Sequence, residues 1–588
     1  MGLLAVVAVG FLVYSLLAVM ITSPRAFTDE LEYFEAAASI ANGDGAGVNG
    51  EPYHHALLYP LALAPILALA PDREAAYEAA KLLNALFIAL TAVPAYLLAR
   101  RLLTPWWSVA VAGLAVAVPS AMYVSVTMTE SLAYLAFAWV VVAIVLALER
   151  PTWARQLAVI AAIALASGVR TQFLSLFGAY VAGLAICALL LPERRRWKAQ
   201  ARTLAPTLAL MTAAVGVFLV APVVRGSTPG VLGGYSPLWR TYDLDEVGKW
   251  LVYHLANLEL YLAVVPFAVA PIVLSLVYRR ARDGSERHVA FLALFVSANA
   301  TLLVIVAAFN STFWAGERLH DRPLFYVVPL WLVVLGVWLA EGLPRPRAAA
   351  AVGAATALVL PLFLPFQEYA REEVESQFIA AAPTLWSVIN QHVAAIGVTG
   401  LGALLLFVLA TVLAMLLVPA RFGAAFVALV FSVFAVTSGL AWHGAIRPSD
   451  RWAAIVPPGQ HSWVDDRVPP GSRVTLLTAV APCSPPATLR ASYLTDFFNE
   501  SVRKVAHLAY EPNSLGSVDV RVSSDGRVDR SSGGPLRTEY VVAPVSVNLA
   551  GRRLAAAPTA RLVLTRVPGE VRIRGDAWRA EVAAGRCS

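Results

Sequence analysis

The sequence predicts a polytopic all-α membrane protein that ends in a soluble, extracytoplasmic α/β or β-rich domain. Of the 588 residues, 59% are hydrophobic and only 14% are charged, whereas a soluble domain carries about 25% charged residues. Long apolar segments recur through residues 1–446, and none of comparable length follows. An ordinary soluble enzyme is therefore excluded. The chain divides into a membrane domain (1–446) and a soluble domain (447–588).

A helix that crosses a bilayer needs about 20 mostly apolar residues. Segments that meet this length, or approach it with suitable flanks, predict about thirteen transmembrane helices. No basic region precedes the first segment, so we expect a retained anchor rather than a signal peptide. Around residues 168–171, one kinked helix and two short helices fit equally well. The segments lie near residues 3–22, 76–99, 105–123, 130–148, 154–168, 171–191, 203–224, 255–278, 288–309, 323–341, 348–365, 393–418 and 422–442.

Basic residues are distributed unequally over the two sides of these predicted spans. Alternating the spans places 16 basic and 5 acidic residues of the membrane domain on one side, against 10 basic and 20 acidic residues on the other. Positively charged loops stay cytoplasmic, so the N-terminus is predicted to be cytoplasmic. The C-terminal domain is then external, as are the loops 23–75, 224–254, 310–322 and 366–392.

The polar region after residue 446 is punctuated by Pro and Gly and holds short runs rich in β-branched residues. It contains 19 basic and 13 acidic residues, so most of the net charge of +7 belongs to it. Cys483 and Cys587 both lie in it, in a compartment where a disulfide between them would persist. Strands are predicted at Arg473–Thr478, Val518–Val522, Tyr540–Val547 and Ala560–Val567, a hairpin turn at Asp525–Gly526 and a helix over Asp496–Ala509.

The stretch directly after the first predicted span carries two adjacent acids, Asp29 and Glu30. Two interpretations are open. Thr28 can cap a short interfacial helix, whose first-turn acids suit the positive end of the helix dipole. Alternatively, Asp29 is held at the end of a rigid span beside membrane-borne substrates, where a carboxylate can take the proton of an attacking hydroxyl.

The rest of this loop also fits a surface site. A turn-rich stretch, residues 43–50, precedes the sequence from Tyr53 to Pro60. Residues 56–70 are apolar but too short to cross the membrane, so they predict a helix lying in the interface. His54 and His55 could bind a metal, but adjacent side chains point apart and no third ligand is evident. No metal site is therefore predicted.

This layout resembles the GT-C superfamily of membrane glycosyltransferases, above all the protein O-mannosyltransferases and lipid A aminoarabinose transferases. The resemblance covers about residues 1–330. It rests on the acidic pair followed by Tyr33, on the Tyr-His-His…Tyr-Pro helix, and on the Ala- and Leu-rich span from Tyr77 to Arg101. It implies a GT-C-like fold in which Asp29 is the catalytic base, with Glu30 beside it. The residues that could then contact sugar or acceptor are Tyr33, His54, His55 and Tyr59.

Glu130 and Arg170 lie at the external ends of later predicted spans. Members of this family often carry an Asp near the start of the fourth span, where this chain has Glu130. Glu130 could orient the acceptor, although an acid at a helix start also suits the dipole. Arg170 follows the break near residue 168. A basic residue within the bilayer is costly, so Arg170 is a candidate ligand of the donor phosphate.

The external loop before residue 323 holds two further arginines. Arg322 precedes Tyr326-x-x-Pro329, as an Arg often does in the family. Together with Arg318 it could grip the donor phosphate and stabilise the charge that grows as the phosphate leaves. The charges of this loop could instead pair with one another, which stabilises by only about 0–1 kcal/mol per pair. Nearby candidates for sugar contact are Glu317 and His320.

Tyr235 and Trp239 lie in the external loop 224–254. Their rings could stack on a sugar, but an aromatic belt at the membrane interface accounts for them better.

We therefore expect an inverting glycosyltransferase of the EC 2.4 class in a bacterial plasma membrane. It would move a sugar from a polyprenyl-phosphate donor to a hydroxyl of a lipid, glycan or protein acceptor on the external face. The leaving phosphate bears its own charge, so no cofactor is required, and a divalent cation stays open. Membrane lipids are expected partners and nucleic acid is not. The alternative is a multi-span transporter or a flippase for lipid-linked glycans. Such proteins usually show inverted repeats and mid-membrane polar residues, whereas here the ionisable residues gather at the external ends of the spans.

Overall fold

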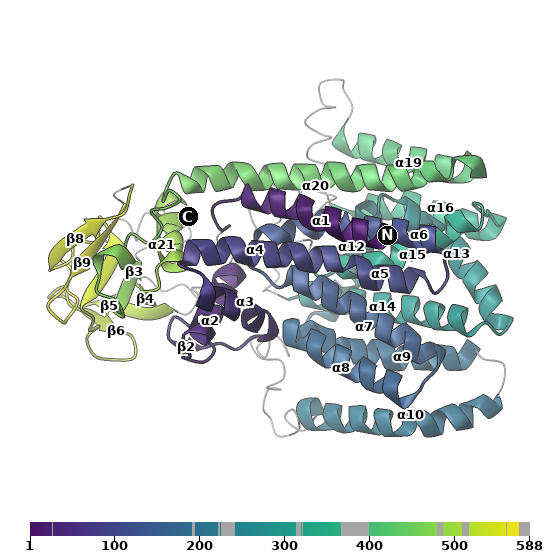
Figure 1. Cartoon of the computed structure of the whole chain (residues 1–588), viewed down its shortest axis with the longest axis horizontal. Coiled ribbons are helices and arrows are strands. Elements are labelled where there is room, and N and C mark those ends of the chain that lie inside the picture. Colours follow the sequence, from purple (N-terminus) through teal and green to yellow (C-terminus); the bar gives the residue numbers. More distant parts are fainter. Residues whose placement is uncertain are drawn as a thin grey trace.

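The computed structural model shows a bundle of long helices with a β-rich domain at one end (Figure 1). It describes residues 1–25, 28–190, 194–220, 224, 242–312, 319, 322–365, 399–478, 486–508, 517–559 and 561–575.

The described part of each segment predicted to span the membrane forms a helix or two consecutive helices. The α-helices of the bundle are α1 (Gly2–Val19), α4 (Arg73–Leu90), α5 (Ala92–Ala99), α6 (Pro105–Val116), α7 (Glu130–Glu149), α8 (Trp153–Val169), α9 (Leu176–Leu190), α10 (Arg194–Val215), α12 (Leu244–Tyr261), α13 (Val265–Arg282), α14 (Glu286–Asn310), α15 (Val328–Ala340), α16 (Arg347–Val359), α19 (Gly400–Leu417) and α20 (Ala424–Ala453). Short 3₁₀ turns join some of them, namely η1 (Pro119–Ser125), η2 (Thr171–Ser175), η6 (Phe325–Val327), η7 (Leu360–Phe363) and η9 (Ala420–Phe422).

Seven helices in the described part of the chain are long and apolar enough to cross a membrane, and two bent pairs would raise the number to nine. The predicted number of thirteen straight spans is not confirmed. Other predicted segments form shorter apolar helices such as α8, which has 17 residues. At 1.5 Å per residue, such a helix is about 25 Å long, shorter than the roughly 30 Å of a bilayer core.

The predicted span 255–278 is broken. Helices α12 and α13 meet at an angle of 103°. Ala263 and Val264 adopt positive φ values of 55° and 68° between them. Pro266 follows at the start of α13. It has no N–H to continue a helix and disfavours the α conformation of the residue before it. A single straight helix therefore cannot form here.

The described part of the predicted first external loop, residues 23–75, is folded. Helix α2 (Thr28–Ala41) follows α1 and is succeeded by a hairpin of β1 (Gly47–Val48) and β2 (Glu51–Pro52). Asn49 and Gly50 form its turn with positive φ values of 52° and 86°, as a two-residue hairpin requires. A helix is present where an interfacial helix was predicted over residues 56–70, namely α3 (Leu58–Leu69).

The C-terminal domain contains a seven-stranded mixed sheet with the strand order β6-β5-β4-β3-β7-β9-β8. Strands β3, β4, β5 and β7 run parallel, and the outer strands pair antiparallel. Its elements are β3 (Val474–Thr478), α21 (Pro486–Phe498), β4 (Val502–His507), β5 (Ser517–Val522), β6 (Val528–Arg530), β7 (Tyr540–Pro544), β8 (Arg552–Ala556) and β9 (Leu562–Arg566).

The four predicted strands and the turn at Asp525–Gly526 are present in this sheet, but the predicted helix Asp496–Ala509 is wrong. Helix α21 ends at Phe498, and residues 502–507 form the interior strand β4. The β-branched Val502 and the pair Val505 and Ala506 are buried in the sheet. Burial between strands β3 and β5 therefore overrides the local helix propensity.

The C-terminal domain is docked onto the loop formed by residues 23–75. Arg73, the first residue of α4, is ion-paired with Glu35 of α2 and donates a hydrogen bond of 2.9 Å to the carbonyl oxygen of Phe497. The ring of Phe34 stacks on that of Phe497, with centroids 4.4 Å apart. Helix α2 thus packs directly against α21 of the soluble domain.

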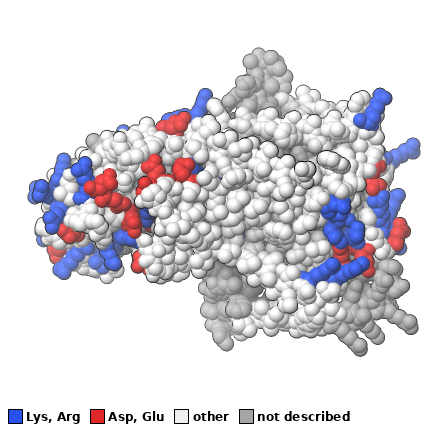
Figure 2. Space-filling model, viewed as in Figure 1, with Lys and Arg blue, Asp and Glu red and all other residues white. Residues whose placement is uncertain are grey.

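Charged side chains gather at the two ends of the molecule, and the visible face between them is almost free of charge (Figure 2). One charged end is the C-terminal domain (Figures 1 and 2). The apolar middle is the surface that a bilayer would cover.

Candidate functional site

Four segments far apart in the sequence meet where the loop formed by residues 23–75 joins the bundle. They bring together Asp29 in the first turn of α2, Glu130 at the start of α7, Arg170 between α8 and η2, and Arg322 just before η6. Asp29 and Arg322 are 293 residues apart. Asp29, Glu130 and Arg170 each lie at the end of a helix, and Arg322 lies in the turn before η6, so these elements position their backbones.

Arg322 connects the two carboxylates. Its Nη2 donates a hydrogen bond of 2.7 Å to Oδ2 of Asp29, and its Nε donates to Oε1 of Glu130. Arg170 also donates through Nη1 to Oε1 of Glu130, and to Oγ1 of Thr129 at 3.3 Å. The buried carboxylate of Glu130 therefore binds the guanidinium groups of both Arg170 and Arg322, and the carboxylate of Asp29 binds that of Arg322.

The exposure of the four side chains differs in a way that separates their roles. The side chain of Glu130 is fully buried and that of Arg170 is 13% exposed. Arg322 is 24% exposed and Asp29 41% exposed. Asp29 is thus the carboxylate that a substrate can reach, whereas Glu130 can only act through the arginines that it binds.

The pKa of Asp29 is lowered. Partial burial of the carboxyl group acts to raise it, but the charge and the hydrogen bond of Arg322 outweigh this effect, helped by the charges of Arg170 and His55. Asp29 is therefore ionised at neutral pH, as a general base must be. Burial acts to lower the pKa of Arg322, but the charges of Glu130 and Asp29 outweigh burial and raise that pKa.

Glu30 lies apart from this network. Its side chain is fully buried, and its carboxylate accepts hydrogen bonds from the backbone N–H groups of Arg25 (2.8 Å) and Thr127 (3.1 Å). Burial raises its pKa to about 7, and the two hydrogen bonds and the charge of Arg25 oppose this only in part. Glu30 thus ties the start of α2 to the chain after α1 and to the turn before α7.

The aromatic residues predicted to contact a substrate form a cluster beside Asp29. Tyr33 makes edge-to-face contacts with Tyr53 and Tyr59, whose ring centroids lie 6.4 and 5.7 Å away. Tyr59 is fully buried, and its hydroxyl donates to Oδ1 of Asn84 at 3.2 Å, so Tyr59 supports the cluster from within.

The two adjacent histidines are placed differently. His54 is exposed, whereas His55 is half-buried with its Nε2 3.6 Å from Oε2 of Glu32. Burial lowers the pKa of His55 and raises that of Glu32 to about 7. Within the described ranges, no group of three or more His, Cys, Asp or Glu side chains is arranged to hold a metal ion.

Several predicted residues lie outside the described residues. They are Arg318, Glu317, His320, Tyr235, Trp239, Cys483 and Cys587.

The prediction missed a buried lysine next to the site. Lys81 in α4 is fully buried. Its ammonium group donates to the carbonyl oxygens of Ala18 (2.9 Å) and Ile21 at the end of α1, and to Glu78 at 2.7 Å. It therefore satisfies the last carbonyls of the helix that precedes Asp29. A lysine within an apolar span is a signal that could have revealed it.

No family model matches this chain, and no curated protein matches it in sequence. Its fold is similar to that of ArnT from Cupriavidus metallidurans, a GT-C glycosyltransferase. One ArnT structure has undecaprenyl phosphate bound (16% identity, TM-score 0.52), and another is in the apo state (14% identity, TM-score 0.53). Both comparisons cover 96% of this chain and 97% of ArnT. The predicted likeness to the aminoarabinose transferases is thus confirmed for the fold, over almost the whole chain.

Proposed function

We propose that this protein is an inverting glycosyltransferase. It moves a sugar from a polyprenyl phosphate to a hydroxyl of a lipid, glycan or protein acceptor on the external face of the plasma membrane. The observation that carries the proposal is the contact of Asp29, an accessible carboxylate, with Arg322, one of two adjacent arginines. A carboxylate that can act as a base thus lies beside two arginines that can bind a phosphate. The likeness in fold to ArnT, which has been solved with undecaprenyl phosphate bound, supports the same donor class.

Arg322 and Arg170 are proposed to hold the donor phosphate. Guanidinium groups bind phosphate oxygens through two charge-assisted hydrogen bonds. Glu130 accepts from both arginines with the same oxygen, and so it keeps them together despite their like charges. When the phosphate arrives, it competes with Asp29 for Arg322. Asp29 is thereby released to act as a base only when the donor is present.

The reaction then follows from these positions. The acceptor hydroxyl gives its proton to Asp29 while its oxygen forms a bond to C1 of the sugar. The bond between C1 and the phosphate oxygen breaks on the opposite face, and its electron pair leaves with the phosphate. The transition state resembles an oxocarbenium ion. Arg322 and Arg170 stabilise the negative charge on the departing phosphate.

Glu30 is assigned a positioning role in this scheme rather than a catalytic one. Its carboxylate is fully buried and engaged by two backbone N–H groups, so it does not reach a substrate. It fixes the first turn of α2, which carries Asp29.

The proposed reaction requires no metal, and we expect turnover to survive treatment with EDTA.

The test of this function is turnover of polyprenyl-phosphate sugars by the purified full chain and by Asp29→Asn. Loss of the general base should lower the rate about 10²–10⁴-fold. Glu341→Gln is the control, since Glu341 is paired with Arg280 and is not one of the site residues. It should keep most of the activity.

Two results would contradict the proposal. Turnover unchanged by Asp29→Asn removes Asp29 as the base. If a protein with normal thermal unfolding shows no turnover with any donor, the glycosyltransferase function is excluded and the alternative function as a transporter is favoured.

A further inference from the structure

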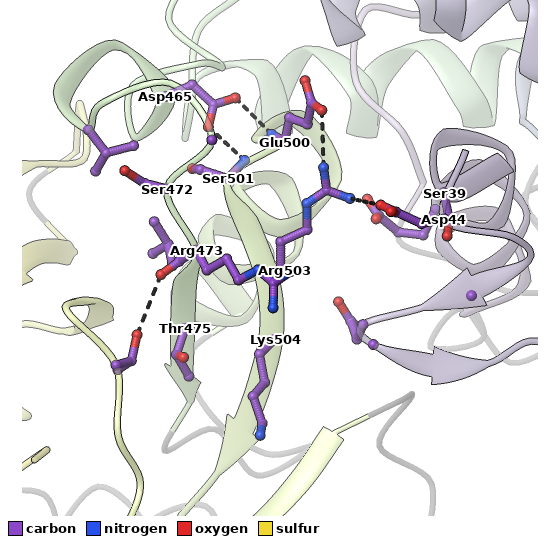
Figure 3. Close-up of a pocket in the computed structure, with 18 of the residues that line it drawn as sticks. Ser39, Asp44, Asp465, Ser472, Arg473, Thr475, Glu500, Ser501, Arg503 and Lys504 are labelled. Atoms are coloured by element: carbon purple, nitrogen blue, oxygen red, sulfur yellow. Dashed lines mark hydrogen bonds and ion pairs between the residues drawn. The ribbon is translucent and has the colours of Figure 1, made fainter. Parts of the chain in front are cut away.

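A cleft of about 1010 Å³ separates the first external loop from the C-terminal domain. One wall is formed by the second half of α2 and the β1–β2 hairpin, including Ser39 and Asp44. The other is formed by the residues at the beginnings of β3 and β4, including Arg473 and Lys504 (Figure 3). This volume lies at the upper end of the range for small-molecule sites.

In the described part of the chain, polar side chains join the two walls. Nδ2 of Asn42 donates a hydrogen bond of 3.0 Å to Oε1 of Glu500. Nη1 of Arg503 lies 3.8 Å from Oδ2 of Asp44, and its Nη2 lies 3.1 Å from Oε1 of Glu500 (Figure 3). These contacts connect the end of α2 to the start of β4. The width of the cleft is thus set by side chains of both domains, and neither domain forms the cleft alone.

We propose that this cleft binds the glycan part of the acceptor, an inference that rests on the proposed function. Its lining mixes donors and acceptors of both charges with hydroxyl groups, among them Ser39, Ser472, Thr475 and Thr538. Five carboxylates lie among four cations, so the lining has no large excess of either charge. Such a surface matches an uncharged chain of hydroxyl groups, and it does not match a prenyl chain or a polyanion.

The wall formed by the C-terminal domain argues against the addition of a peptide strand, whereas the two-residue strands β1 and β2 of the other wall each keep one free edge. Strands β3 and β4 are interior strands, each paired on both sides. They therefore offer no free edge to which an extended peptide could add. Binding of a peptide is therefore one of the results that the test below distinguishes.

Helix α2 connects the cleft to the reacting groups. Asp29 lies in its first turn, and Ser39 lines the cleft ten residues later. At 1.5 Å per residue, this separation is about 15 Å along the helix. A glycan of several sugars could thus place its terminal hydroxyl at Asp29 while its remaining sugars occupy the cleft. The cleft would then select acceptors by length.

The experiment uses the full chain in nanodiscs and three probes: cellotetraose as a neutral glycan, tetragalacturonate as an anionic one, and a neutral polar dodecapeptide. Binding is measured by saturation-transfer NMR without any donor. Ser472→Trp places a large ring in the cleft, and Arg473→Glu reverses an exposed charge in it. The matched control is Ser532→Trp, an exposed position of the same domain that does not line the cleft. Unfolding curves confirm that each variant is folded.

We expect cellotetraose to bind the wild type and Ser532→Trp, and to bind Ser472→Trp at least tenfold more weakly. During turnover, the cleft variants should raise the acceptor KM about tenfold and leave the donor KM and kcat nearly unchanged. Binding that is confined to tetragalacturonate or the peptide, that is absent, or that is unchanged in Ser472→Trp overturns the inference. If Asp29→Asn abolishes transfer while the cleft variants have no effect, the proposed glycosyltransferase function is supported and glycan binding in the cleft is refuted.

Discussion

Arg322 is the residue on which the chemistry of the proposed site depends. Its guanidinium contacts Asp29 and Glu130 at once, and its charge is the main reason that the pKa of Asp29 is lowered despite burial. Arg322 thereby has two roles, since it keeps the base ionised in the free enzyme and can turn to the phosphate when the donor binds.

Arg322→Gln tests both roles. Without the positive charge, the pKa of Asp29 should rise, because burial then acts unopposed by its nearest partner. A base works only when it is deprotonated, so the acid limb of the pH profile of kcat/KM should move to higher pH. The maximal rate should also fall about 10²–10³-fold, through loss of phosphate stabilisation.

The measurement is kcat/KM for the donor across pH 4 to 9. Arg421→Gln is the control, since Arg421 is an exposed arginine far along the chain from these residues. An acid limb that stays in place in Arg322→Gln would show that Arg322 does not tune Asp29.

At the scale of elements, helix α2 is held between the membrane bundle and the soluble domain. Glu30 ties its first turn to the bundle, and Phe34 and Glu35 contact Phe497 and Arg73. The base therefore lies on a helix whose position depends on both domains.

Phe497→Ala should weaken this docking. Phe497 is fully buried against Phe34 and Tyr77, and removing a buried Phe side chain costs about 3–5 kcal/mol. We expect a lower Tm and reduced turnover. Leu489→Ala lies on the same helix but at a 43% exposed position, and both quantities should stay near the wild-type values. Equal effects of the two substitutions would refute a specific role of the interface.

A second element-scale feature is the close crossing of α13 and α16. A Cβ at Gly353 of α16 would lie 2.0 Å from the carbonyl oxygen of Ala268 in α13, whereas a Cβ at Gly178 of α9 would meet nothing within 4 Å. Gly353→Ala should therefore force the helices apart and lower the stability by about 1–3 kcal/mol. Gly178→Ala should be neutral or slightly stabilising. Tm values in one detergent compare the two, and equal values would contradict the close packing.

The whole molecule has an uncharged middle and charged ends (Figure 2). The C-terminal domain extends beyond one end of the helices, on the same side as α2 and α3 (Figure 1). Asp29, the cleft and this domain therefore share one side of the membrane, which the distribution of basic residues predicts to be the external side.

This orientation is tested by cysteine labelling in a background where Cys187, Cys483 and Cys587 are replaced. Arg553→Cys, exposed in the C-terminal domain, should react with a membrane-impermeant maleimide on intact cells. Arg421→Cys, in a loop that is predicted to be cytoplasmic, should react only after the membrane is opened. The reverse pattern would place the proposed reaction in the cytoplasm.

The sequence predicted the helices of the bundle, the turns and helices of the first loop and four strands of the soluble domain. These are decided locally, by apolar length, by alternation and by turn residues such as Asn49 and Gly50. It failed at two places. Residues 502–507 were predicted as helix and are an interior strand, because burial in the sheet opposes their local preference. The predicted span 255–278 is broken at its positive-φ residues, just before Pro266.

For the site, the sequence pointed to Asp29 by its place directly after the first apolar span, and to Arg170 by the cost of a charge within the bilayer. Glu130 and Arg322 were named because their positions resemble those of charged residues in the GT-C family. Only the tertiary structure decided that Arg322 joins Asp29 to Glu130, that Glu30 faces the backbone, and that a cleft opens between α2 and β4. These contacts link residues up to several hundred positions apart. They depend on how preformed helices pack, and no local pattern of side chains specifies that packing.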